Sequence, residues 1–262
     1  MQIFRSVLSF VSITATAAAT TSNNNAFRWS GLLPAGQRLE IRGVNGSIHA
    51  EASTGRTVDV SAAKNGHLSD PDKVRIVVVE NGRGITVCAV YAPQFDETGC
   101  TDRGATRAPA NDVEVDFTVR VPSAVKFTAR TVNGDVVVRK LDADVDVHTV
   151  NGKVDVSTMR AVDAETVNGS IHAALGATAW AGRKRFVTVN GGVDLELPYG
   201  INADLFATTL NGKIATDFPA HVSGNLVKHE VHRTLGSGGR GLSVYTTNGS
   251  IRVHRFCRRA HA

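Results

Sequence analysis

The stretch TVNGDVVVRKLDADVDVHTVNGKVDVSTMRAVDAETVNGSIHA, residues 131–173, contains the tetrapeptide Thr-Val-Asn-Gly three times, beginning at Thr131, Thr149 and Thr166. Asn-Gly flanked by alternating apolar residues is the strongest short-range signal for a β-hairpin. The stretch therefore forms either a row of hairpins or another strand-rich arrangement built on the same residues.

The motif extends well beyond this stretch. A small or apolar residue, Asn-Gly, any residue and then Ile or Val occurs seven times, and five copies begin Thr-Val-Asn-Gly or Thr-Leu-Asn-Gly. From the second copy to the sixth the spacings are 18, 17, 22 and 21 residues, with 37 more to the last. Such periodicity indicates a repeat architecture. The repeated residues are Asn45, Gly46, Asn133, Gly134, Asn151, Gly152, Asn168, Gly169, Asn190, Gly191, Asn211, Gly212, Asn248 and Gly249.

Side-chain parity argues against hairpins. Residues two apart along a strand point to the same face, and a two-residue hairpin would break this alternation. In the second copy Val132, Gly134 and Val136 share one parity, and the other copies of the regular section keep the same pattern. We therefore expect each Asn-Gly to lie within, or at a shallow bend of, a continuous extended segment with its glycine on the buried face.

A repeat that holds one such strand cannot bury its apolar face alone. Each unit also contains a second short apolar run, such as 143–147 or 162–164, and stacking of equivalent strands about 4.8 Å apart would bury a continuous core. The sequence predicts an all-β chain folded as a parallel β-solenoid, with the asparagines in a hydrogen-bonded column. The alternative is an antiparallel β-meander closed as a barrel or sandwich, in which Asn-Gly is a turn.

The regular repeats occupy residues 126–256, and residues 27–125 are expected to form longer, irregular coils of the same solenoid. Strand-like runs such as TVDVSA and VEVDFTVRVP support this assignment. The segment VVENGRGIT around Asn81 has the pattern of a true hairpin. Residues 257–262 form a basic tail that could cover an exposed end of the stack.

The N-terminus has the layout of a secretory signal peptide. One early positive charge at Arg5 precedes an apolar stretch and a run of small residues that ends at Ala19. We expect residues 1–19 to be removed and residues 20–26 to be disordered. The apolar stretch is far shorter than the ~20 residues that a membrane span needs, and no second one follows. The mature chain is therefore expected outside the cytoplasm, in the periplasm or at the cell surface.

The three cysteines fit an oxidising compartment. Cys88 ends a strand-like run and Cys100 follows it after a polar excursion, so this pair is expected to form a disulfide, while Cys257 in the basic tail is expected to be free. The spacing of the cysteines and histidines does not match a metal-binding motif, and we expect no metal and no cofactor.

Composition and charge exclude other classes. The formal net charge of +5 comes from scattered basic residues without aromatic interleaving, which argues against nucleic-acid binding. Asp155 and Asp194 fall in one outward column two rungs apart, about 10 Å in a regular stack. Paired-carboxylate glycosidases use separations of roughly 5–9.5 Å, so no catalytic residues are expected.

The TVNGxI repeats, the VPS at 121–123, the segment LPYGINADLFATTLNGKIATDFP at 197–219 and the segment LGSGGRGLSVYTTNGSIRV at 235–253 resemble a bacterial family of "putative adhesins", β-strand-repeat proteins of unknown function. The resemblance covers roughly residues 40–255. It implies an exported or envelope-associated solenoid and supplies no catalytic residues.

The function expected from these features is a non-enzymatic binding or scaffold surface at the bacterial cell envelope. Its ligand would be a glycan or protein of the envelope or extracellular space, and the chain is expected to be a monomer without a transmembrane segment. The alternatives are an enzyme that acts on envelope or extracellular polysaccharide and a regulatory module that senses envelope stress.

Overall fold

The structure is a computed structural model that describes residues 25–91, 100, 111–218, 222–225 and 228–255. The expected signal peptide, the tail at 257–262 and Cys257 lie outside the described residues. Within them the chain forms strands and one short 3₁₀ turn, η1 (Pro71–Lys73), so the prediction of an all-β chain is confirmed. Ala26 already belongs to the first strand, inside the segment expected to be disordered.

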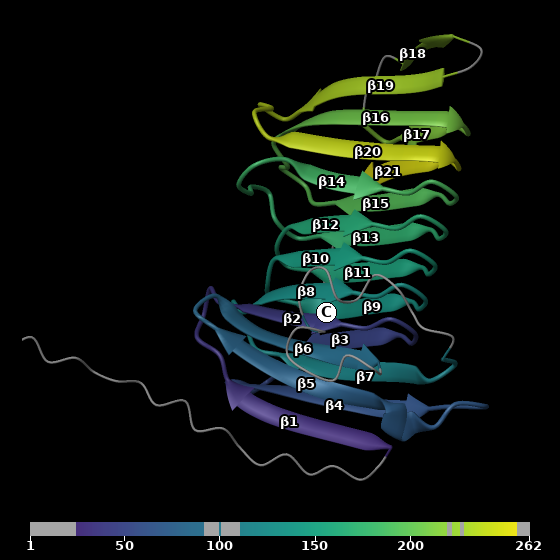
Figure 1. Ribbon diagram of the computed structural model, residues 1–262. Helices are drawn as coiled ribbons and strands as arrows, with labels where there is room; N and C mark the ends of the chain where they lie inside the picture. The colour runs from purple at the N-terminus through teal and green to yellow at the C-terminus, as the bar shows by residue number, and fades with distance from the viewer. Residues whose placement is uncertain (1–24, 92–99, 101–110, 219–221, 226–227, 256–262) are drawn as a thin grey trace, which may run out of the picture.

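The strands form two large sheets that face each other along one axis (Figure 1). The first, sheet A, has in spatial order β1 (Ala26–Leu32), β4 (Thr57–Asn65), β7 (Glu114–Val121), β3 (Ile48–Ala52), β9 (Val136–Leu141), β11 (Val154–Thr158), β13 (Ile171–Leu175), β15 (Val193–Leu197), β21 (Ile251–Arg255) and β17 (Ile214–Thr216).

The second, sheet B, has in spatial order β18 (Val222–Asn225), β19 (Lys228–Leu235), β16 (Ala203–Asn211), β20 (Gly241–Asn248), β14 (Lys184–Val187), β12 (Val162–Glu165), β10 (Val145–His148), β8 (Lys126–Arg130), β2 (Arg38–Arg42), β6 (Gly84–Tyr91) and β5 (Val74–Asn81).

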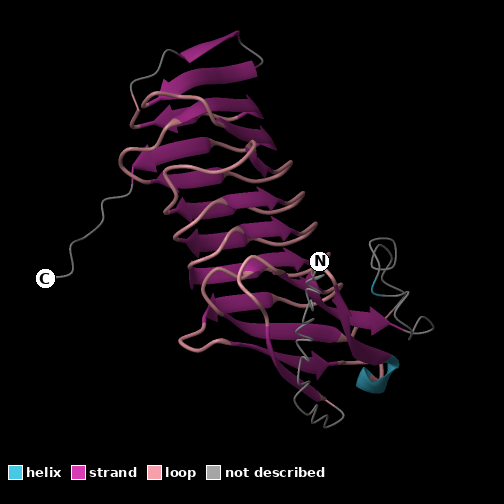
Figure 2. Ribbon diagram, turned by 90° about the vertical axis from the view of Figure 1, so that its left-hand side faces the viewer, coloured by secondary structure: helices cyan, strands magenta, loops and turns pink. Residues whose placement is uncertain are grey.

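Both sheets are mixed, with parallel pairing in the middle and antiparallel pairing at the ends. From β8 to β15 the chain alternates between the sheets, and each strand pairs in parallel with the strand about one repeat away. We call one strand of sheet B with the following strand of sheet A a coil; the corners of successive coils lie above one another (Figure 2). Antiparallel pairs add β1, β4 and β5 at one end and β18 and β19 at the other.

At both ends the order of coils in space departs from their order in the chain. Coil β2–β3 lies between the strands β6 and β7 on one side and coil β8–β9 on the other. Coil β20–β21, the last described, lies between coil β14–β15 and coil β16–β17, which precede it in the chain. The 37-residue gap before the last repeat is therefore an excursion to the far end of the stack, followed by a return.

The core lies between the sheets and consists of the inward side chains of each strand. In β10, β11 and β13 buried and half-exposed residues alternate strictly, as expected for strands with one face in the core. Valine, alanine, isoleucine and leucine fill most core positions, and Phe117, Phe127 and Phe186 are the largest fully buried side chains.

The segment around Asn81 is a true hairpin, as predicted. Strands β5 and β6 pair antiparallel, and Asn81 opposite Gly84 closes a loop of two residues, Gly82 and Arg83. The Asn81 side-chain oxygen accepts a hydrogen bond from the Arg83 amide at 2.9 Å, which stabilises this tight turn.

Candidate binding faces

The repeated tetrapeptide forms the corner that joins sheet B to sheet A. Its threonine is the buried residue: Thr149 is 5% exposed, whereas the next residue, Val150, is 38% exposed. Inward side chains resume only at Val154. The expectation that one apolar phase runs straight through Asn-Gly is wrong, because the corner shifts the alternation by one residue. The motif is thus neither a hairpin nor a straight strand.

The seven repeat asparagines form one continuous column at this corner, the asparagine ladder. Each side-chain amide after the first donates to the side-chain oxygen of the preceding asparagine in the column, at 2.7–2.8 Å. The spatial order is Asn45, Asn133, Asn151, Asn168, Asn190, Asn248 and Asn211. At its first end the Asn45 amide donates to the backbone oxygen of Asn111 at 3.1 Å. Each amide therefore satisfies its neighbour along an exposed edge of the stack.

The repeat glycines allow the corners to approach each other closely. A Cβ atom on Gly152 would lie 2.0 Å from the Gly134 backbone oxygen, and one on Gly134 would lie 1.9 Å from that of Gly46. Gly134, Gly152 and the later repeat glycines do not have a positive φ angle, whereas Gly46 has a φ of +115°. Close approach rather than backbone conformation thus requires glycine in most copies, and the glycine faces the neighbouring corner instead of the core.

The buried threonines link each corner to the coil before it. Thr149 Oγ1 donates to the Gly134 backbone oxygen at 3.1 Å, and Thr166 Oγ1 donates to that of Gly152 at 3.0 Å. The same contact recurs at Thr131, Thr188, Thr209 and Thr246. A hydroxyl at this position is satisfied inside the core, so threonine is tolerated where an apolar residue would be expected.

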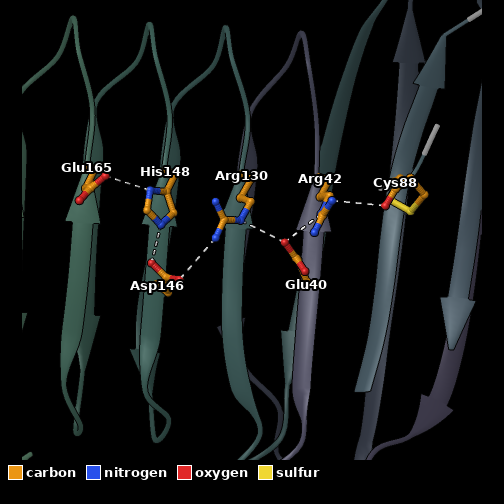
Figure 3. Close-up of polar contacts among 8 residues, drawn as sticks. Glu40, Arg42, Cys88, Arg130, Asp146, His148 and Glu165 are labelled. Carbon is orange, nitrogen blue, oxygen red and sulfur yellow. Dashed lines mark hydrogen bonds and ion pairs between the residues drawn. A yellow bond between two sulfur atoms is a disulfide. The ribbon is translucent and has the colours of Figure 1, made fainter. Parts of the chain in front are cut away.

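The outer face of sheet B carries a line of acidic and basic side chains that crosses β2, β8, β10, β12 and β14, which we call the charged row. Figure 3 shows the part of it from Arg42 to Glu165. Its members are Arg42, Glu40, Arg130, Asp146, His148, Glu165 and Arg185. Glu40 accepts from Arg42 at 2.8 Å and from Arg130 at 3.1 Å, and its side chain is only 8% exposed. Parallel, in-register stacking places these side chains in line, because equivalent positions of neighbouring coils lie opposite each other.

The middle of the charged row is electrostatically satisfied. His148 Nε2 lies 2.8 Å from Asp146 Oδ1, and His148 Nδ1 lies 3.4 Å from Glu165 Oε2. Burial raises the pKa of the Asp146 carboxyl, but the hydrogen bond and charge of His148 and the charge of Arg130 outweigh burial, so this pKa lies below its usual value. Asp146 therefore stays ionised at neutral pH and fixes the residues beside it.

Beyond the charged row the same face becomes aromatic. Phe206 on β16 has its ring centroid 5.6 Å from that of Tyr245 on β20 and 6.3 Å from that of His232 on β19. The flanking Val187 and Thr208 lie directly opposite Tyr245 on the two neighbouring strands. The outer face of sheet B thus carries charged side chains over its middle strands and aromatic side chains on β20, β16 and β19.

The outer face of sheet A carries a shorter polar line, into which both expected column carboxylates fall. Arg139 binds Asp155 with two hydrogen bonds of 3.1 and 2.7 Å. His172 lies opposite both Asp155 and Asp194, and its ring nitrogens contact Asp155 at 3.2 Å and Glu196 at 3.3 Å. Burial lowers the pKa of His172, but its hydrogen bonds to Asp155 and Glu196 raise it more, so the net shift is upward.

This line ends at Asp194, whose Oδ1 atom lies 3.0 Å from His254 Nε2. Both atoms are buried, and they are within ion-pair distance without the geometry of a hydrogen bond. The two column carboxylates are thus separated by His172 and have different partners.

The disulfide between Cys88 and Cys100 is present, as predicted, with the two Cα atoms 5.6 Å apart. The bridge lies on the outer face of sheet B, where Val77, Val79 and Val90 pack around it in a small apolar cluster separate from the main core. Arg42 Nη1 donates to the Cys100 backbone oxygen at 3.3 Å, so the bridge adjoins the start of the charged row (Figure 3).

Within the described part of the chain, no group of three or more His, Cys, Asp or Glu side chains is arranged to hold a metal ion. A search of the same residues for a long apolar helix able to cross a membrane finds none.

No family model matches the sequence, and no curated protein matches it. Among solved structures, the chain is similar to a "putative cell adhesion protein" from Clostridium sporogenes, with 8% identity, a TM-score of 0.44, and coverage of 87% of this chain and 99% of that one. It is also similar to a "putative adhesin" from Bacteroides fragilis, with 12% identity, a TM-score of 0.28 and coverage of 89% and 98%. A third similar structure is a "putative lipid binding protein" from Parabacteroides distasonis, with 10% identity, a TM-score of 0.34 and coverage of 90% and 98%. At these identities and TM-scores the similarities carry no argument about function.

Proposed function

We propose that this chain is an exported, non-enzymatic β-solenoid whose outer faces act as an adhesin-like binding or scaffold surface at the bacterial cell envelope. The observation that carries the proposal is the outer face of sheet B, where the charged row continues into the aromatic cluster of Phe206, Tyr245 and His232. A flat face with registered polar groups every ~4.8 Å suits an extended ligand, either a glycan or a protein.

The assignment as a solenoid is supported by the strict alternation of strands between the sheets from β8 to β15 and by the asparagine ladder. In the antiparallel sandwich alternative, consecutive strands of a sheet would be joined by hairpins. Antiparallel pairs here are confined to the ends, where they cover the last parallel strands.

Export is supported by two independent features. The Cys88–Cys100 disulfide fits an oxidising compartment, and residues 1–19 have the layout of a signal peptide. Mass spectrometry of the native protein tests this part: a mature N-terminus near residue 20 is expected, and intact Met1–Ala19 on exported protein would contradict it.

The absence of catalysis is supported by the state of the column carboxylates. A general acid or nucleophile needs a carboxylate that can reach substrate. Both oxygens of Asp155 are held by Arg139, and the Asp194 Oδ1 atom is buried beside His254. These groups fit a structural polar line better than a catalytic pair.

The test is a binding array of envelope glycans, peptidoglycan fragments and extracellular matrix proteins, run beside a turnover assay on the same ligands. Binding without turnover is expected. Tyr245→Ala and His232→Ala on sheet B should weaken binding, because aromatic contacts to a ligand typically contribute ~1 kcal/mol or more. Val137→Ala, on the outer face of sheet A, is the matched control and should bind normally. Turnover of any ligand, or equal loss in all three variants, would refute the proposal.

A further inference from the structure

One end of the stack is a step, because sheet A is one strand longer than sheet B there. At this end β5 faces β4, and β1 extends beyond them with no described strand of sheet B opposite (Figure 1). In the described part of the chain β1 and β5 are therefore edge strands, of seven and eight residues. The next strand position of sheet B, beside β5 and opposite β1, is not taken by any described strand.

The middle of β5, residues 76–79, has the composition of a central strand. Ile76 and Val78 point towards the core, while Val77 and Val79 point to the outer face near the disulfide. All four residues are half-buried and form a segment without charge, proline or bulge; the charged residues Arg75 and Glu80 flank it, and Glu80 shares the inward parity of Val78. Strands that are apolar on both faces are typical of sheet interiors, whereas edge strands of monomers usually carry a lysine, a proline or a bulge.

The inner side of β1 supplies an apolar surface opposite the strand position beside β5. Trp29 is half-buried, and its ring lies over Gly31, where a Cβ atom would be 2.5 Å from a ring carbon. Phe27, on the same inner side of this strand, is buried. An added strand beside β5 would face this tryptophan across the core.

At the opposite end of the stack, the described residues form no edge strand of comparable length. Its outermost strands are β17, with three residues, and β18, with four. Very short edge strands are a common way in which proteins prevent further pairing. In the described part of the chain the long edge strands are therefore concentrated at one end, which favours a closed pair over a filament.

We propose that two copies of this chain form a dimer through this end, with β1 of each copy paired to β5 of the other. A two-fold axis parallel to the strands places sheet A of one copy in line with sheet B of the other. Each overhanging β1 then takes the strand position beside the partner's β5. The two copies of Trp29 then face each other across the joint. Pairing of β5 with its own copy would instead place β1 on the position of the partner's β4, so that arrangement is excluded by the step.

This dimer replaces the monomer expected from the sequence and does not depend on the proposed binding function. A protein that binds no ligand could still form this dimer. A protein that is a monomer would still have the same outer faces for binding a ligand. The interface is isologous, as in most homodimers, and extends both sheets without a break.

The experiment compares the full exported chain with two variants by light scattering after size exclusion and by sedimentation equilibrium. We expect a wild-type mass twice that of one chain. Val78→Lys should weaken association by roughly 100-fold, because an inward lysine on an edge strand can reach solvent in a monomer but not in a joined sheet. Val137→Lys, a half-buried valine on a central strand, should leave the dimer intact.

Hydrogen exchange locates the interface and distinguishes a loss of association from a folding defect. In wild type, amides of β1 and β5 should exchange more slowly as concentration rises, while in Val78→Lys they should exchange at a concentration-independent rate and the rest of the protein should be as protected as before. A monomer at the highest soluble concentration, a dimer that resists Val78→Lys, or protection gained elsewhere would each overturn the proposal.

Discussion

Replacement of Gly152 by alanine tests the stacking of the corners most directly. The new Cβ atom would lie 2.0 Å from the Gly134 backbone oxygen and 2.5 Å from its carbonyl carbon. Both obstacles are backbone atoms, so a rotamer change cannot relieve the clash. To reach an ordinary contact of 3.4 Å, the two coils must separate locally by about 1.4 Å.

Such a separation breaks the contacts that join these coils. The Gly134 amide donates to the Asn151 backbone oxygen at 2.9 Å, and Thr149 Oγ1 donates to the Gly134 backbone oxygen at 3.1 Å. Two lost hydrogen bonds at ~1 kcal/mol each and overpacking of about 1–3 kcal/mol predict that Gly152→Ala lowers the free energy of unfolding by about 3–5 kcal/mol.

Gly82→Ala is the matched control. Gly82 lies in the β5–β6 hairpin loop, where an added Cβ has nothing within 4 Å and the backbone is not left-handed. Urea denaturation followed by circular dichroism should show a change within about 0.5 kcal/mol for this variant. Equal losses at the two glycines would refute the close stacking of the corners.

Three further outcomes are expected. Because the pKa of His172 is raised in the folded state, its contribution to stability is complete below the unfolded pKa of about 6.5 and disappears as the pH rises through the folded pKa. The melting temperature of the wild type should therefore fall relative to that of His172→Gln between pH 6 and pH 8.5. A difference between the two melting temperatures that does not change with pH would contradict this. Cys88→Ser opens a loop with a sequence separation of 12 and should lower the free energy of unfolding by about 3 kcal/mol, whereas an unchanged denaturation midpoint would show that the bridge does not stabilise the fold. Asn168→Ala removes one hydrogen bond on each side of the asparagine ladder and should destabilise by about 1–2 kcal/mol in the same denaturation assay, against a smaller loss for Asn81→Ala.

The repeat carried most of what the sequence could predict. The spacing of 17–22 residues between the repeat asparagines from Asn133 to Asn211 indicated stacked units, and their side-chain amides lie in one column joined by hydrogen bonds of 2.7–2.8 Å. The side-chain alternation at the corner was predicted wrongly, because Thr149 and Val150 are both compatible with a strand. The buried hydroxyl finds the Gly134 carbonyl, a partner on another coil, and that contact is not encoded within one repeat.

The order of coils and the charged row could not be predicted from the sequence. Nearly identical corners can stack on one another in any order, so the sequence TNGSI at 247–251 does not specify which coil it joins. The charged row had a weak signal in Asp146 and His148, which alternate with buried valines in VDVH at 145–148. Its ion pairs depend on the register between strands, and the sequence alone leaves this register open.

The interleaved order of the coils at both ends determines where further coils can be inserted into the stack. A coil inserted beside coil β2–β3 or coil β20–β21 would have to displace strands that return from elsewhere in the chain, but the coils from β8 to β15 follow one another in simple order. Tandem duplication of an 18-residue unit in that middle section would insert one more corner into the asparagine ladder and lengthen both faces by about 4.8 Å. Related chains can thus differ in length by whole coils while the strands at both ends of the stack stay the same. The number of repeats then sets the length of the exposed face.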